Sequence, residues 1–294
     1  PMGALSTLYI CFALKKHDTD FIKVYFDSLK WYKEIYMISA EGARNHGLLN
    51  VPTDEFFATK HYLPENTAEQ RKIADFLIAL DRRIDAQQSL VDALKKYKRG
   101  LLSREFGQQE NGDLNNRHVG KLKDYFHLSS GSTPSSTNRA FYSGNIRWVS
   151  SGELKPKYLC ETSQHISSEA VSSCNLREYP ANTLLIAMYG LEAAGVRGTA
   201  SILSVPATIS QACMAIQQTG EIDIEYLYYW YIYNGQWIGI RIAQGTKQQN
   251  LSTDTLGSLR IYAPSYSKQK KVCKLLSQID YLIEKESQKF DLIS

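Results

Sequence analysis

The chain has no long apolar segment. None of its apolar runs approaches the roughly 20 residues that a membrane-spanning helix needs, so a membrane span and a membrane partner are not expected. The first residues, PMGALSTLYICFALKK, are apolar for only about ten positions and follow no basic segment, which argues against a secretory signal peptide. The length of 294 residues is enough for one large soluble domain or two smaller ones.

Cysteine is scarce and charge is nearly balanced. The five cysteines are scattered and form no Cys-x-x-Cys motif, which argues against a zinc ribbon or a disulfide framework and indicates a reducing cytoplasm. The net charge of +4 permits nucleic-acid binding without requiring it. Residues 119–264 carry eleven Lys and Arg against ten Asp and Glu, so a basic surface there must come from their arrangement.

Motifs for catalysis and cofactor binding are also missing. The sequence has no P-loop, no G-x-G-x-x-G turn after a strand and no G-x-S-x-G motif. Its six histidines have no spacing that suits a metal. Carboxylate pairs such as Asp81 and Asp85 lie on a predicted helix, where solvated charges are far more common than general acids. We therefore expect a protein that is not an enzyme, with no cofactor, no metal site and no catalytic residue.

An internal repeat is the strongest feature that is present. Residues 50–64, NVPTDEFFATKHYLP, match residues 250–264, NLSTDTLGSLRIYAP, at five of fifteen positions with a constant offset of 200. After a slip of one residue both copies continue as charged amphipathic helices, in which Gln70 matches Gln269. The repeat predicts a polar turn, a strand-like piece that ends in proline, and then a helix.

Both predicted helices carry apolar residues at alternating spacings of four and three. This is the 3.5-residue period of a coiled-coil seam, so we expect the two helices to pack on each other. From Ala68 to Arg104 the first helix would extend about 55 Å. Gln87 and Glu286 occupy the same seam position and are interpreted either as residues that set the register or as a solvated break. The predicted pairing residues are Ile73, Leu77, Leu80, Ile84, Val91, Leu94 and Leu101 in the first copy and Val272, Leu276, Ile279, Ile283 and Phe290 in the second.

The remaining sequence predicts one mixed α/β unit. Strands are expected at 145–150, 183–190, 199–204 and 207–216, followed by a helix at 221–242. The first residues predict a strand at 6–14 and a helix at 19–35, which resemble only the end of that unit. We therefore expect a remnant of a first domain (1–64), a long helix (65–106), a linker (107–118), a complete domain (119–264) and a second, shortened helix (265–294).

Three polar loops are candidates for contacts with nucleic acid. They combine Gly, Ser, Thr, Asn, Gln and basic residues, which contact phosphates and base edges in protein–DNA complexes. The other interpretation is that these loops are simply hydrated. Trp148 and Trp237 are interpreted as core residues in preference to residues that stack on bases. The candidate DNA-binding residues are Ser132, Thr133, Asn138, Arg139, Arg147, Lys155, Arg197, Thr246, Lys247, Gln248 and Gln249.

The helix and its repeat resemble a known family. A proline-ended segment followed by EQRKIADFLIALDRRIDAQQSLVDALKKYKRGLL at 69–102 is similar to the conserved regions of type I restriction-modification specificity subunits. Residues 121–136, 147–154, 209–216 and 245–252 resemble parts of their target recognition domains. The resemblance implies an α+β fold in which two recognition domains lie at opposite ends of an antiparallel coiled coil. Each domain would read one half of a bipartite site in double-stranded DNA.

The resemblance also implies partners. The long helices would set the spacing between the half-sites and dock DNA methyltransferase (modification) subunits, and restriction subunits would join that complex. The sequence departs from the family because it holds one complete recognition domain. It is interpreted as a fragment, as a product of gene rearrangement, or as a half-subunit that pairs with a second copy. The alternatives are a coiled-coil scaffold that binds protein, or the recognition module of a fused nuclease and methylase.

Overall fold

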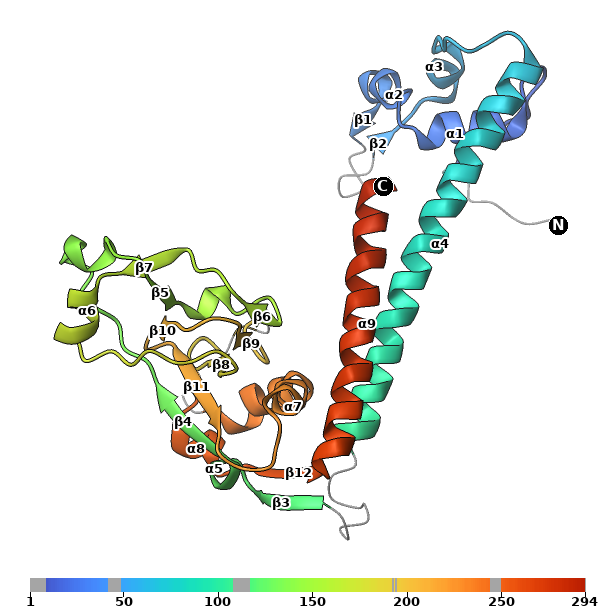
Figure 1. The fold of residues 1–294 in the computed structure, drawn as a ribbon. Helices are drawn as coiled ribbons and strands as arrows, with labels where there is room; N and C mark the ends of the chain where they lie inside the picture. The colour runs from blue at the N-terminus through green and yellow to red at the C-terminus, as the bar shows by residue number, and fades with distance from the viewer. Residues whose placement is uncertain are drawn as a thin grey trace. The chain divides into compact units, whose positions relative to one another are not determined.

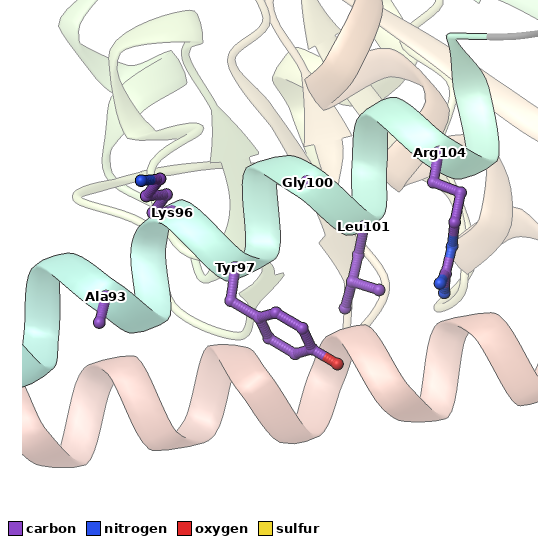
Figure 2. Close-up of a pocket in the computed structure, with 6 residues that line it drawn as sticks. All are labelled: Ala93, Lys96, Tyr97, Gly100, Leu101 and Arg104. Carbon is purple, nitrogen blue, oxygen red and sulfur yellow. The ribbon is translucent and has the colours of Figure 1, made fainter.

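The computed structural model describes residues 9–41, 49–107, 117–191, 193, 195–243 and 250–293. It divides into two compact units, of which unit 1 is Pro1–Val91 with Glu286–Ser294 and unit 2 is Asp92–Lys285. The two longest helices, α4 (Thr67–Phe106) and α9 (Tyr266–Ile293), each contribute to both units (Figure 1). No helix in the described ranges is long and apolar enough to cross a membrane.

Unit 1 is mainly helical. A predicted single helix over 19–35 is wrong, because the chain breaks at Leu29, whose φ of 58° is incompatible with a continuing right-handed helix. The predicted strand at 6–14 is also wrong for its described part, since residues 9–14 form no strand. The elements that precede α4 are α1 (Thr19–Asp27), α2 (Tyr32–Ile38), β1 (Ala40–Glu41), β2 (Leu49–Asn50) and α3 (Thr53–Ala58).

A buried glutamine joins α1 to α4 in unit 1. Gln70 is fully buried, donates to the carbonyl of Pro64 (2.6 Å) and accepts from the backbone N–H of Asp18 (2.9 Å). The Asp18 side chain caps α1 by accepting from the N–H of Phe21 (2.9 Å). Arg71, the next residue of α4, forms an ion pair with Asp18 (3.5 Å). The start of α4 is thus bonded to the start of α1.

The long helices contact each other in unit 1 through the predicted polar seam position. Gln87 Nε2 donates to both the backbone carbonyl and the carboxylate of Glu286, each at 2.9 Å. The two residues are therefore bonded to each other, which favours the interpretation that they set the register over that of a solvated break. Of the nearby predicted pairing residues, Ile73, Leu77 and Ile84 are partly buried, whereas Leu80 is 37% exposed.

The described residues of unit 2 form three sheets. The largest has the order β4-β11-β8-β9-β6, in which all pairs are antiparallel except the parallel pair β6 and β9. A second sheet has the order β10-β5-β7, and β3 pairs with β12. The strands are β3 (Arg117–Lys121), β4 (Phe126–Ser130), β5 (Ile146–Val149), β6 (Tyr158–Leu159), β7 (Gln164–Ile166), β8 (Leu184–Ala187), β9 (Ala200–Leu203), β10 (Thr208–Ile209), β11 (Cys213–Gln218) and β12 (Arg260–Pro264).

The predicted strands and helix of this unit occur with shifted limits. The expected strand at 207–216 is two strands, β10 and β11, separated by a turn. The expected helix at 221–242 begins as α7 (Ile224–Trp237), capped by the side chain of Asp223, and continues as a π-helical turn, Ile238–Ile242. The short helices of this unit are α5 (Leu122–Tyr125), η1 (Arg139–Tyr142), η2 (Ser151–Glu153), α6 (Ser168–Ser173) and α8 (Thr253–Gly257).

The central strand β8 is buried on both faces. Leu184 and Ile186 pack in one apolar cluster with α7 and the long helices, whereas Leu185 and Ala187 pack in a second cluster on the opposite face. This alternation follows from the two-residue period of a strand. It explains why the sequence here is continuously apolar instead of alternating with polar residues.

The sequence repeat reproduces the same joint in unit 2. Gln269 is fully buried, donates to the carbonyl of Pro264 and accepts from the N–H of Asp223, both at 2.8 Å. Lys270 pairs with Asp223 (2.6 Å), as Arg71 pairs with Asp18. In both units, therefore, the start of a long helix holds the capped end of a shorter one.

The repeat differs in one segment. Residues 260–264 form strand β12 because β3 pairs with them, whereas residues 59–64 form no strand. The predicted strand-like piece is therefore right for the second copy only. The predicted turn before it is a short helix in both copies, α3 and α8.

In unit 2 the last turns of α4 contact α9. Leu101 belongs to the same buried cluster as Leu276 and Ile279, and Lys98 forms an ion pair with Asp280. Val272 and Leu94 are partly buried. The helix-pairing residues and the five-part domain division stay predictions at the level of individual residues and limits.

Candidate nucleic-acid interface

Four strand ends of the largest sheet meet at one edge. Because β11 is antiparallel to both β4 and β8, the C-terminal ends of β4 and β8 lie beside the N-terminal end of β11. The N-terminal end of β9 lies there too, because β9 is antiparallel to β8. We call this the reading edge. It gathers the loop after Ser130, the turn at 210–212 and the loop at 188–199.

A glycine fixes how the first loop leaves the sheet. A Cβ at Gly131 would lie 2.2 Å from the carbonyl oxygen of Ile209, so no other residue fits without a shift of the backbone. The N–H of Gly131 donates to Cys213 (3.2 Å) and the N–H of Ser132 donates to Ile209 (3.1 Å). The loop therefore crosses the ends of β10 and β11 before it reaches solvent.

The candidates in this first loop are exposed. Ser132 accepts through its carbonyl from Trp148 Nε1 (3.3 Å), and Thr133 Oγ1 accepts from the N–H of Gln211 (3.4 Å). Asn138 caps the turn η1 by accepting from Ala140 (3.2 Å), which leaves the exposed Arg139 at the start of that turn. Ser132 and Thr133 thus lie at the reading edge itself.

Arg147 lies on β5 of the second sheet, and Lys155 lies three residues before β6. Arg147 is half-buried and its Nε donates to the carbonyl of Cys160 (3.1 Å), whereas Lys155 is exposed. Between them Glu153 accepts from the backbone N–H groups of Ser150 (2.8 Å) and Ser163 (2.6 Å). Burial alone raises the pKa of Glu153, but these hydrogen bonds outweigh it and hold the pKa below its usual value. The Glu153 carboxylate is therefore hydrogen-bonded within the fold.

Arg197 lies in a cradle of glycines. Its Nε donates to the carbonyl of Leu191 (2.6 Å), and a Cβ at Gly239 would lie 2.6 Å from its Cγ. A Cβ at Gly235 would lie 2.1 Å from the Cα of Gly198, whose φ of +77° is left-handed. The loop therefore rests directly on α7 and its π-helical turn. Gly235 and Gly239 were missed as site residues, although their spacing of four in an apolar helix is a signal for close backbone approach.

The third predicted loop lies outside the described residues. Thr246, Lys247, Gln248 and Gln249 fall in that segment. The described chain resumes at Asn250, and the N–H of Leu251 donates to the carbonyl of Met188 (2.9 Å), next to the C-terminal end of β8. Leu251 therefore lies beside the reading edge.

The two tryptophans predicted to be core residues differ. Trp148 is 7% exposed, which agrees with the prediction. The prediction is wrong for Trp237, which is 50% exposed at the end of α7. The next residue, Ile238, is fully buried while Trp237 is not, because a helix turns neighbouring side chains in different directions.

One group of described residues has the donor types of a metal site. Asp223, Glu225 and Cys273 lie within 4.8 Å of one another. Both carboxylates, however, already have cationic partners, since Asp223 pairs with Lys270 and Glu225 pairs with Lys157. Burial raises the pKa of the Cys273 thiol, which disfavours the thiolate that binds metals. The group is an ion-pair network within the fold.

Comparison with known proteins decides the family. The profile of the type I restriction modification DNA specificity domain matches residues 116–293, which is more than half of the chain and includes the whole reading edge. The chain belongs to this family. The predicted resemblance and the predicted α+β fold class are confirmed.

Curated relatives of this chain come from Methanocaldococcus jannaschii and Escherichia coli. The specificity subunit of the type I restriction enzyme MjaIX of Methanocaldococcus jannaschii is 28% identical over 179 residues, covering 60% of this chain and 40% of the relative. The EcoR124I/EcoR124II specificity subunit of Escherichia coli is 25% identical over 214 residues, covering 72% of this chain and 51% of the relative. The chain therefore spans about half the length of the curated relatives it matches.

Solved structures share the fold of this specificity-family chain. The S subunit of a type I restriction-modification system from M. genitalium matches with a TM-score of 0.58 at 16% identity, covering 95% of this chain and 70% of that one. The HsdS subunit from Thermoanaerobacter tengcongensis matches with a TM-score of 0.58 at 15% identity, covering 87% of this chain and 62% of that subunit. At these identities the likeness concerns the fold alone.

Proposed function

We propose that this chain is a DNA sequence-recognition subunit of a type I restriction-modification complex and that unit 2 reads one half of a bipartite DNA site. The observation that carries the proposal is the reading edge, where the loop after Ser130 and the loop at 188–199 leave neighbouring strands of a specificity-family fold. The chain itself is not the catalyst. It works in the cytoplasm, in keeping with five cysteines that form no disulfide.

The residues of the reading edge divide by chemistry into two roles. The exposed cations Arg139 and Lys155, together with Lys247 of the predicted third loop, neutralise phosphates and position the domain. Ser132, Thr133, Asn138, Arg147, Arg197, Thr246, Gln248 and Gln249 carry the donors and acceptors that distinguish bases. Because unit 2 outside the long helices is nearly neutral, affinity depends on these few placed groups more than on a general positive field.

The long helices would hold the partners. We propose that α4 and α9 pair through the predicted seam residues, set the spacing between half-sites, and dock methyltransferase and restriction subunits. The relatives carry the name specificity subunit of type I restriction enzymes, which supports these partners. The proposed division remains a remnant (1–64), a long helix (65–106), a linker (107–118), a recognition domain (119–264) and a second helix (265–294). A second copy of the chain would supply the other half-site reader.

The test is DNA binding by the full chain. Selection from random-sequence duplex DNA, with and without the methyltransferase subunit of its own system, should return one half-site, and affinity should fall steeply as salt rises. Absence of detectable DNA binding with the partner present would refute the proposal. That outcome, with retained binding of the partner, would favour a coiled-coil protein scaffold, which the near-neutral charge of 119–264 also allows.

A further inference from the structure

Lys157 is a charged residue that lies inside unit 2. It directly precedes β6, and its side chain is 14% exposed. Its ammonium group pairs with Glu225 of α7 and donates to Ser277 Oγ of α9 (2.6 Å) and to the hydroxyl of Tyr229 of α7 (2.9 Å). An ammonium group has three donors, so all three have partners here.

The contacts of Lys157 continue to both long helices. Ser277 Oγ donates to the Glu225 carboxylate (2.6 Å), and the Tyr229 hydroxyl donates to Asp280 of α9 (2.7 Å). Asp280 in turn pairs with Lys98 of α4. Polar contacts therefore run without a break from the edge strand of the sheet, through α7, to α9 and α4. We call these six residues the Lys157 network: Lys98, Lys157, Glu225, Tyr229, Ser277 and Asp280.

Aromatic rings surround the charge. Lys157 Nζ lies 4.5 Å from the ring centroid of Tyr229, 5.1 Å from that of Tyr158 and 5.7 Å from that of Tyr228. Burial alone raises the pKa of Glu225, but hydrogen bonds from Lys157 and Ser277 lower it below the usual value. Two cations and two carboxylates are thus balanced in a partly dry site, where hydrogen bonds have strict geometry.

The Lys157 network lies where the orientation of the sheet relative to the long helices is set. The apolar cluster that joins α7 to the long helices is stabilised by the hydrophobic effect, which is non-directional. Among the described residues, strand β6 is a two-residue edge strand that pairs with β9, and Lys157, the residue before it, attaches it to α7 and α9. Exposed Lys155, a candidate phosphate contact, is two residues before Lys157. A rotation at the network would therefore move the reading edge relative to the adjoining turns of α4 and α9.

We propose that the Lys157 network is a polar joint that fixes the angle between the reading edge and the adjoining segments of the long helices, and that Lys157 is a positioning residue for sequence recognition. This inference rests on the proposed function. Lys157 contacts no DNA in this role. It acts by holding β6, and with it the base-reading loops, in one orientation.

The first experiment separates positioning from stability. Lys157→Met keeps the side-chain stem but leaves the Glu225 charge without its cation, so both stability and sequence preference should fall. In the double variant Lys157→Met with Glu225→Gln, neither partner is charged, and thermal stability should recover towards wild type. Sequence preference, measured as the ratio of affinities for the selected half-site and a scrambled duplex, should stay at least about tenfold lower, the loss of roughly one base contact.

A matched control separates positioning from phosphate contact. Lys155→Met makes the same substitution two positions away at an exposed site. It should weaken binding to both duplexes equally and reduce the slope of log affinity against log salt by about one. The Lys157 variants should leave that slope unchanged. A double variant that melts like wild type and keeps the wild-type sequence preference overturns the proposal.

A second measurement needs no DNA. Spin labels at the exposed Cys160, beside β6, and at Gln278→Cys, on α9, would report the distance between the sheet and α9 in a chain with Cys11→Ser and Cys174→Ser. The distance distribution should broaden in both Lys157 variants. An unchanged distribution overturns the joint. A broadened distribution in a protein whose wild type shows no DNA sequence preference refutes the proposed function and leaves the joint standing as a structural element.

Discussion

Replacing Gln269 by leucine should destabilise unit 2 strongly, although leucine has a similar volume. Gln269 is fully buried and accepts from the N–H of Asp223 (2.8 Å). Its Nε2 donates to the carbonyls of Pro264 (2.8 Å) and Glu221 (3.3 Å). Gln269→Leu removes all three bonds at once, and no polar group on leucine can replace them.

The expected loss follows from the groups left without partners. The two short bonds each leave a buried N–H or carbonyl unsatisfied, at about 1–3 kcal/mol per group. The apolar leucine recovers roughly 1 kcal/mol by its own burial. We therefore expect the free energy of unfolding of unit 2 to fall by about 1–5 kcal/mol.

The assay can observe unit 2 alone. Of the four tryptophans, Trp31 lies in unit 1, and the others, Trp148, Trp230 and Trp237, lie in unit 2. In a Trp31→Phe background, tryptophan fluorescence during urea unfolding therefore reports unit 2. Gln278→Leu, at an exposed position of α9, makes the same substitution and should change stability by less than about 0.5 kcal/mol. If Gln269→Leu costs no more than this control, the joint is not the stabilising contact that we infer.

Three further outcomes are expected. Gly131→Ala should lower both stability and DNA affinity, because its Cβ would lie 2.2 Å from the Ile209 carbonyl oxygen. The control Gly152→Ala, whose Cβ meets nothing within 4 Å, should change neither. Equal melting and binding curves for the two variants would refute this. The pKa of Glu225 is lowered from 4.5, so its stabilisation is present above that value and is lost as pH falls through the folded pKa. The difference in urea midpoint between wild type and Glu225→Gln should therefore be constant near neutral pH and shrink as pH falls below 4.5, and a difference that already shrinks between pH 7 and pH 5 contradicts it. Lys247→Ala should weaken binding to all DNA sequences, whereas Gln248→Ala should change preference at one base pair, and unchanged binding curves for both would remove this loop from the site.

Local periodicity made the helices and most strands of unit 2 predictable. The heptad spacing gave α4 and α9, and the apolar runs gave β5, β8 and β9 within a few residues. The prediction failed where a single backbone conformation ends a helix. At Leu29 a left-handed φ ends the helix, although the apolar spacing would continue it. It failed also at 6–14, where an apolar run suggested a strand and residues 9–14 form none.

The candidate site was predictable by residue type and not by arrangement. Polar loops rich in Gly, Ser and Arg suggested contacts with DNA, but nothing in the sequence placed Ser132 beside the turn at 210–212. Strand order depends on pairing between segments far apart in the chain, which local patterns do not encode. The glycine cradle of Arg197 and the Lys157 network were missed for the same reason, since their members come from separate elements.

The sequence by itself determined that the chain carries two copies of one segment that leads into a long helix, in which Gln70 matches Gln269. Only the tertiary structure decided what the joint is: in each copy the glutamine is buried between a proline carbonyl and the N–H of an aspartate, Asp18 or Asp223. Each aspartate is more than forty residues from its glutamine in the sequence. A residue type and its spacing are properties of the local sequence, whereas a buried hydrogen bond exists only when distant backbone groups are brought together without water.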